Sequence, residues 1–171
     1  MTFFLHYKKH QLITSSEICC HLNNPEDLHN DMANQFKKIL VPLDGSSQSL
    51  KALDNALNLA SLTDGVITGL HVIPHVPSGG PRTKAYDKQL LQEGKIITQN
   101  AKKIADKKGI KFNSRVVRGW PGLETVKIAK SGKYDHIVMS TTGTGSAKGD
   151  MLGSVSNYVL HKSHIPVYLI K

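Results

Sequence analysis

The chain has 171 residues, of which 39% are hydrophobic, and its formal net charge at pH 7 is +9. This length suffices for one domain with a buried core, and apolar runs of only a few residues exclude a membrane-spanning helix of about 20 residues. The two cysteines, Cys19 and Cys20, are adjacent, which excludes a disulfide framework. We therefore expect a soluble, cytoplasmic protein whose positive charge favours anionic partners.

Residues 1–31 show neither sustained alternation nor helical periodicity. We expect them to form an N-terminal extension, disordered or loosely attached, outside a folded domain that spans residues 32–171. Met32 opens a stretch that resembles an ordinary protein start, so an upstream start codon is our hypothesis for the extension. Its histidines and cysteines lack the spacing of a metal-binding frame, and we expect no metal site there.

From Phe36 onward, short apolar runs alternate with segments of helical periodicity, and glycine, proline or capping residues separate them. The expected elements are, in chain order, strand 39–43, helix 47–62, strand 66–73, helix 84–108, strand 111–118, a helix from Pro121 to Gly132, strand 136–139, helix 154–162 and strand 167–170. This alternation predicts an α/β fold, an open parallel sheet of five strands with helices on both faces. In such sheets ligands bind beyond the carboxyl ends of the strands, so we expect Leu43 and Met139 to border the site.

The connection from Ser140 to Gly153 is long and poor in apolar residues, which indicates a function of its own. We expect Gly143, Gly145 and Gly149 to permit positive φ and to let backbone N–H groups approach a ligand closely. The helix that follows attracts anions at its N-terminus, and Lys148 adds a positive charge. A phosphate chain is therefore the expected ligand, although the spacing matches neither a P-loop nor a dinucleotide fingerprint.

Three stretches carry a resemblance to a known family: "KKILVPLDGSSQSLKALDNALNLA", "LHVI" and "IVMSTTGTGSAKGDMLGSVSNYVLHKSHIPVYLIK". They resemble the universal stress protein family, and the resemblance covers nearly all of residues 36–171. Nucleotide-binding members of that family carry G-x2-G-x9-G-[ST] after the fourth strand. Gly143 and the pair Gly153-Ser154 match this motif, whereas Ser140 occupies the position of its first glycine.

The resemblance implies an adenine nucleotide of the ATP or AMP type as ligand, with Mg²⁺ as a candidate companion ion. It places Asp44 near the ribose, with the other contacts shared among adenine (Pro42, Leu43, Val72), the underside of the nucleotide (Met139, Ser140) and the phosphates (Gly143, Gly153, Ser154, Val155). It also implies the strand order 3-2-1-4-5 and a homodimer through residues 167–170. An apolar last strand at a sheet edge favours such a partner independently.

Several residues have a structural interpretation beside the functional one. Asp44 is either a ligand contact or a cap of the first helix. His71, between two apolar residues, is expected to be a hydrogen-bonded interior histidine, and Trp120 a packing anchor. If the family's first glycine serves positive φ or very close approach, Ser140 predicts weaker binding; alternatively, its hydroxyl donates to the sugar or a phosphate.

The expected function is that of a nucleotide-binding regulatory module of the stress response, with at most slow ATPase activity, because the predicted site shows no obvious catalytic base. One alternative is a module that binds protein partners without nucleotide. Another is a nucleotide phosphohydrolase that uses Asp44. Nucleic-acid binding is disfavoured, because no aromatic residues interleave with the lysines.

Overall fold

The computed structural model describes residues 37–74, 83–144 and 152–171. The expected extension, residues 1–31, lies outside the described residues, as do Gly145, Lys148 and Gly149. The described elements are β1 (Lys38–Pro42), α3 (Ser47–Ser61), β2 (Val66–Pro74), α4 (Lys84–Lys107), β3 (Lys111–Gly119), α5 (Pro121–Ser131), β4 (His136–Ser140), α6 (Ser154–Lys162) and β5 (Val167–Ile170). Their ends differ from the expected ends by at most one residue.

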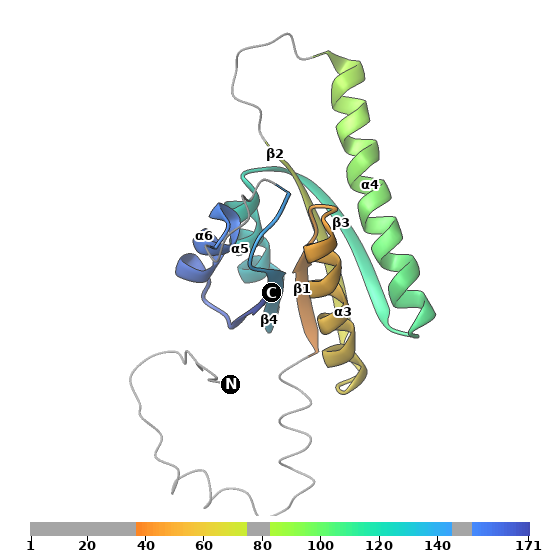
Figure 1. The fold of residues 1–171 in the computed structure, drawn as a ribbon, viewed down its shortest axis with the longest axis vertical. Helices are drawn as coiled ribbons and strands as arrows, with labels where there is room; N and C mark the ends of the chain where they lie inside the picture. Colours follow the sequence, from red (N-terminus) through yellow and green to blue (C-terminus); the bar gives the residue numbers. More distant parts are fainter. Residues whose placement is uncertain (1–36, 75–82, 145–151) are drawn as a thin grey trace, which may run out of the picture.

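The strands form one parallel sheet in the order β3-β2-β1-β4-β5, which confirms the predicted fold class and strand order. The order reverses direction between β1 and β4, because the chain builds outward from β1 to β3 on one side and from β4 to β5 on the other (Figure 1). A gap between the outgoing connections forms at such a reversal, at the carboxyl ends of the strands. The fold therefore places a binding crevice beside the ends of β1 and β4.

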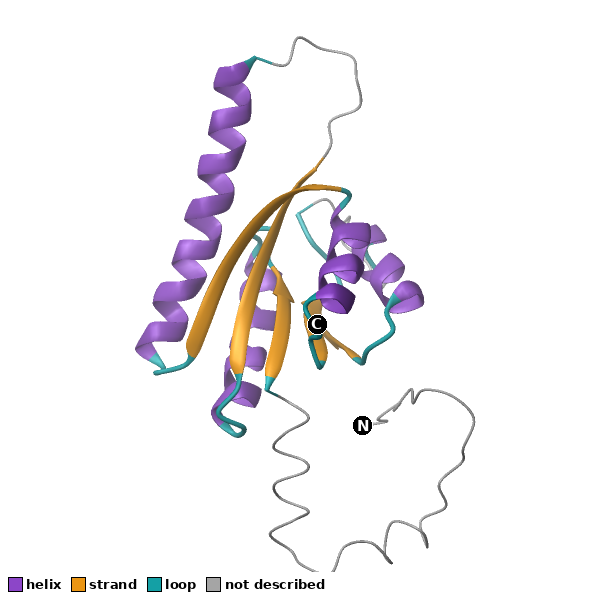
Figure 2. Cartoon of the chain, turned by 180° about the vertical axis from the view of Figure 1, so that it is seen from behind, coloured by secondary structure: helices purple, strands orange, loops and turns teal. Residues whose placement is uncertain are grey.

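Helices cover both faces of the sheet, α3 and α4 on one and α5 and α6 on the other (Figure 2). Successive side chains of β1 alternate between these faces, as the period of two in a strand requires. Ile39 and Val41 pack in the cluster under α3 and α4, whereas Leu40 packs in the cluster under α5 and α6. Burial on both faces explains why β1 is a continuous apolar run.

Left-handed residues end two of the helices. Asp64, with φ of 49°, follows α3, and Gly109, with φ of 70°, follows α4.

The expected packing role of Trp120 is wrong, because 60% of this residue is exposed. Pro121 directly after it begins α5, which is the helix position that a proline without an N–H group fits best.

Within the described ranges, no helix combines the length and the apolar character needed to cross a membrane. In the same part of the chain, no three histidine, cysteine, aspartate or glutamate residues gather in a way that would hold a metal ion.

Candidate functional site

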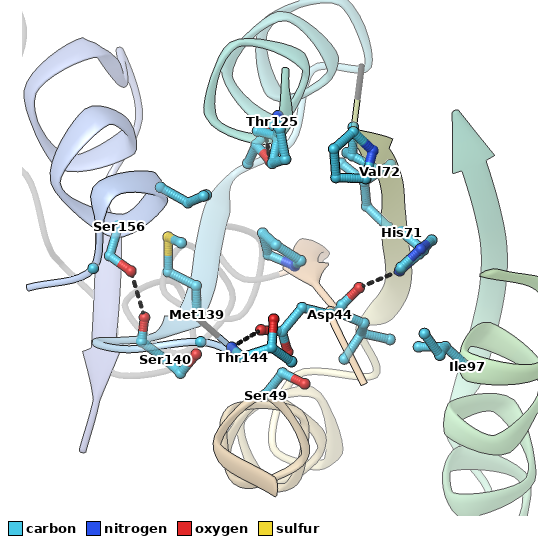
Figure 3. A pocket seen from close by; sticks show the side chains of 18 of the residues that line it. Asp44, Ser49, His71, Val72, Ile97, Thr125, Met139, Ser140, Thr144 and Ser156 are labelled. Atoms are coloured by element: carbon cyan, nitrogen blue, oxygen red, sulfur yellow. Dashed lines mark hydrogen bonds between the residues drawn. The ribbon is translucent and has the colours of Figure 1, made fainter. Parts of the chain in front are cut away.

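A cavity of about 510 Å³ lies at the carboxyl ends of β1, β2 and β4, at the reversal of strand order (Figure 3). This volume falls in the range of small-molecule sites. All ten residues that the resemblance singles out line this one cavity: Pro42, Leu43, Asp44, Val72, Met139, Ser140, Gly143, Gly153, Ser154 and Val155. The structure thus brings together segments that lie more than 100 residues apart in the chain.

Asp44 lies directly after β1, and three donors hold its carboxylate. The amide and the hydroxyl of Ser46 donate to Oδ1 at 3.0 and 2.6 Å, and the amide of Thr144 donates to Oδ2 at 2.9 Å. The side chain that caps α3 is Ser46, which accepts the Ser49 amide at 3.1 Å. Asp44 is therefore not the helix cap; it connects the turn before α3 to the loop after β4.

These hydrogen bonds decide the charge of Asp44. Burial alone would raise the pKa of the carboxyl group, but the hydrogen bonds from Ser46 and Thr144 outweigh it and lower the pKa below its ordinary value of 3.8. The carboxylate is consequently ionised at neutral pH. It forms a fixed negative charge on one wall of the cavity.

Gly143 lies so close to the Asp44 carboxylate that the position has no room for a side chain. A Cβ on Gly143 would lie 2.5 Å from Asp44 Oδ2, which is closer than real Cβ atoms approach another atom. Its φ is not among the positive values found in the described residues, so the expectation of positive φ is wrong for Gly143. The absent side chain lets the loop approach the carboxylate closely enough for the Thr144 hydrogen bond.

The start of α6 forms the opposite wall, and two hydrogen bonds tie it to the backbone at the end of β4. The Gly153 amide donates to the Thr141 carbonyl at 2.8 Å. The Ser156 hydroxyl donates to the Ser140 carbonyl at 2.9 Å (Figure 3). Gly153 is the N-cap residue and offers no side chain, so among the described residues no side-chain hydrogen bond caps α6. The amides of the first turn and the positive end of the helix dipole therefore face the cavity.

Ser140 is the last residue of β4, and it is 8% exposed. Its φ is not positive, so a serine occupies this position without backbone strain. The difference from the family motif is thus confined to one Cβ and one hydroxyl at the floor of the cavity.

The third wall comes from β2. The Leu43 amide donates to the Leu70 carbonyl at 2.8 Å, and His71 Nδ1 lies 2.7 Å from the Leu43 carbonyl oxygen (Figure 3). A carbonyl oxygen only accepts, so Nδ1 carries the proton and donates. The predicted hydrogen bond of His71 is confirmed, but the predicted interior position is wrong, because the residue is only partly buried and lines the cavity.

Comparisons with known proteins decide the family. The family model of the universal stress protein family matches residues 35–171. The chain belongs to the universal stress protein family. Universal stress protein MJ0531 of Methanocaldococcus jannaschii is 34% identical over 142 residues, which is 81% of this chain and 84% of that protein.

Solved structures of this family superpose on the chain. Hypothetical protein MJ0577, from the same archaeon, has a TM-score of 0.73 at 33% identity, covering 80% of this chain and 96% of that chain. The universal stress protein from Archaeoglobus fulgidus in complex with dAMP has a TM-score of 0.64 at 25% identity, covering 79% and 98%. At least one relative thus binds an adenine nucleotide.

In this universal stress protein, six lining residues on α3, α4 and α5 were not predicted from the sequence: Ser49, Leu90, Glu93, Ile97, Pro121 and Thr125. Helical periodicity predicts which face of a helix is buried, but not which turn of that face reaches a cavity. Glu93 adds a second carboxyl group to the lining, and the described part of the lining contains no lysine or arginine. For a phosphate group, the described donors are therefore amides and hydroxyls.

Proposed function

We propose that this universal stress protein binds an adenine nucleotide, of the ATP or AMP type, and acts as a regulatory module of the stress response with at most slow ATPase activity. The observation that carries the proposal is one cavity with the Asp44 carboxylate on one wall and the uncapped start of α6 on another. The carboxylate suits the hydroxyls of a ribose, which are donors. The open amides suit the oxygens of a phosphate.

The apolar part of the cavity suits an adenine ring. Leu43, Val72 and Met139 line it and are each less than 10% exposed. A flat base buried between such side chains gains from the loss of apolar surface to water. The relative solved with dAMP supports the same ligand class. Mg²⁺ is proposed only as the ion that accompanies ATP, held mainly by phosphate oxygens.

The geometry favours a binding role for Asp44 over a role in hydrolysis. Its carboxylate already accepts three hydrogen bonds, and they hold its pKa below the ordinary value. A general base works best with a pKa near the working pH, so a carboxylate of this kind is a poor base for activating water. We therefore place Asp44 in ligand binding and loop positioning.

We also propose a homodimer through β5. The bonds from the Ile137 amide to Pro166 and from the Thr141 amide to Ile170 show that residues 166 and 170 face β4. By alternation, the main-chain groups of Val167 and Leu169 face away from the sheet, where no described strand covers them. Sedimentation should show a dimer that Val167→Pro dissociates, by removing an outward N–H group, and that Val167→Thr retains. A wild-type monomer would contradict this part of the proposal.

The nucleotide proposal is tested with protein purified without added nucleotide. Extraction and mass spectrometry should identify any small molecule that the protein carries, and calorimetric titration with AMP and ATP should show saturable binding. A module that binds only protein partners would carry no nucleotide and would show no heat with either compound. That outcome would overturn the proposal.

A further inference from the structure

The hydrogen-bond ladder between β1 and β2 ends one bond early. In a parallel pair, a residue of one strand donates to the residue before its partner and accepts from the residue after it. Pro42 pairs with Leu70, so Leu43 continues the register opposite His71. The first of the two bonds is made, from the Leu43 amide to the Leu70 carbonyl at 2.8 Å. The register assigns the second bond to the Val72 amide and the Leu43 carbonyl.

That second bond is replaced by a side chain. His71 Nδ1 donates to the Leu43 carbonyl at 2.7 Å, and within residues 37–74 no bond joins the Val72 amide to that carbonyl. The alternation of the strand directs the N–H and C=O groups of Val72 toward β1, as it does those of Leu70. Because β1 has ended there and Val72 lines the cavity, both groups face the proposed ligand site.

A glycine on α4 makes room for the imidazole. A Cβ on Gly94 would lie 2.6 Å from His71 Cδ2 and 3.0 Å from Val116 Cγ1. Glycine in the middle of a helix costs roughly 0.5–1 kcal/mol relative to alanine, so its presence in α4 indicates a packing requirement. The Cδ2 side of the ring thus rests against α4 while Nδ1 reaches the Leu43 carbonyl.

We propose that His71 is a positioning residue for base recognition: by occupying the Leu43 carbonyl, it leaves the Val72 amide and carbonyl available to the edge of an adenine. This inference rests on the proposed function. Adenine presents an acceptor, N1, beside a donor, the 6-amino group, which complements one N–H and one C=O group. Hypoxanthine presents the opposite polarity at these two positions. Without His71, the Leu43 carbonyl takes the Val72 amide, the ladder closes and the base loses its donor.

The first experiment needs no ligand. Nitrogen-15 NMR should show the His71 imidazole protonated on Nδ1, and hydrogen exchange should show the Val72 amide unprotected. His71→Leu should protect that amide by closing the ladder, whereas His71→Asn, whose amide nitrogen can replace Nδ1, should leave it unprotected. A Val72 amide that is already protected in the wild type, or an imidazole protonated only on Nε2, would overturn the inference.

The second experiment measures base discrimination by titration with AMP, IMP and ribose 5-phosphate. His71→Leu should weaken AMP binding by up to about tenfold, the equivalent of one hydrogen bond, and narrow the preference for AMP over IMP. Ribose 5-phosphate should bind as before, because it has no base. His71→Asn should restore the preference, and His161→Ala, at an exposed position on α6, should change none of the three affinities.

Gly94→Ala gives a test that keeps the histidine and does not depend on the folding of His71→Leu. Its Cβ should displace the imidazole and reproduce the loss of base preference. Wild-type protein that binds none of the three ligands would refute the proposed function and this inference with it. Wild-type protein that prefers AMP, with the same AMP-to-IMP ratio in His71→Leu and Gly94→Ala, would refute the inference alone.

Discussion

The neighbouring strands β1 and β4 end in different ways beside the same cavity. After β1, the Leu43 carbonyl is bonded to His71, the Asp44 carboxylate accepts three hydrogen bonds, and Ser46 caps α3. After β4, the Thr141 amide donates to the Ile170 carbonyl and the Gly153 amide donates to the Thr141 carbonyl, but within the described residues no side chain caps the first turn of α6. The wall after β1 is negatively charged, and its polar groups are hydrogen-bonded to one another. The wall after β4 presents main-chain N–H groups of the first turn of α6 to the cavity.

This contrast places a negative charge and the positive end of a helix dipole on two walls of the same cavity. The polar groups after β1 bind one another, so that wall keeps its shape without a ligand. The donors at the start of α6 gain a strong acceptor only when an anion binds, so that wall has the most to gain from a ligand. Gly143 and Thr144 join the two walls, and substitutions at this junction should have the largest effects.

Asp44→Asn should have the largest effect on nucleotide affinity. The amide group of asparagine cannot accept from both Ser46 and Thr144, and the fixed negative charge is lost. We expect a loss on the order of 10- to 100-fold in AMP affinity by calorimetry, as for other hydrogen bonds to charged groups. Asp54→Asn, on the exposed side of α3, serves as the matched control. Unchanged affinity together with abolished ATP turnover would instead favour the phosphohydrolase alternative.

Gly143→Ala should have the next largest effect, because its Cβ would lie 2.5 Å from Asp44 Oδ2 and would separate Thr144 from the carboxylate. We expect AMP affinity to fall by about tenfold, the equivalent of one hydrogen bond to a charged group. The control is Gly109→Ala, where the Cβ has open space but φ is 70°. That variant should lose about 1 kcal/mol of unfolding free energy and keep its affinity. Equal affinities in both variants would contradict the proposed role of Gly143.

His136→Phe should make the free energy of unfolding less sensitive to acid. His136 begins β4 and packs against Tyr168, with ring centroids 5.3 Å apart. Burial lowers its pKa below 6.5, although nearby Asp135 acts to raise it, so the unfolded chain takes up the proton more readily than the folded chain. The stability of the wild type should therefore fall as the pH drops below about 6.5, and that of His136→Phe should fall less.

Asp44 acts in a different pH window. Its pKa is lowered from 3.8, so its contribution is complete above that value and is lost as the pH falls further. Urea unfolding of the wild type, His136→Phe and Asp44→Asn between pH 8 and pH 3 measures the contribution of each residue to stability. Parallel curves for the wild type and His136→Phe between pH 7.5 and 5.5 would refute the role of His136.

Ser140→Gly should have the smallest effect on affinity. The backbone at Ser140 is that of an ordinary strand, because its φ is not positive, so this position does not require a glycine. We expect AMP and ATP affinities within about threefold of the wild type, and a loss of roughly 0.5–1 kcal/mol in unfolding free energy, because glycine weakens a strand. Calorimetry and thermal unfolding measure the two quantities. A tenfold gain in ATP affinity would mean that the serine side chain obstructs the phosphates.

Much of the fold followed from residue patterns. Apolar runs such as 136–139 and the spacing of residues in 154–162 predicted the elements, and the meeting of parallel strand ends predicted that Leu43 and Met139 share a site. The contacts between those ends were not predictable in the same way. That Thr144 donates to Asp44, or that His71 donates to the Leu43 carbonyl, depends on loop and side-chain geometry that no periodicity encodes. Trp120 shows the same limit, since hydrophobic character alone did not predict its exposure.

The bond between Asp44 and Thr144 joins residues 100 positions apart. This contact forms only after most of the chain has been synthesised, because Thr144 is residue 144 of 171. Closing so long a loop also costs entropy that other contacts must offset. Fragments that stop before β4, including nascent chains on the ribosome, therefore contain β1 and its carboxylate but no finished crevice. Competence to bind a ligand would then report that synthesis and folding of this domain are complete.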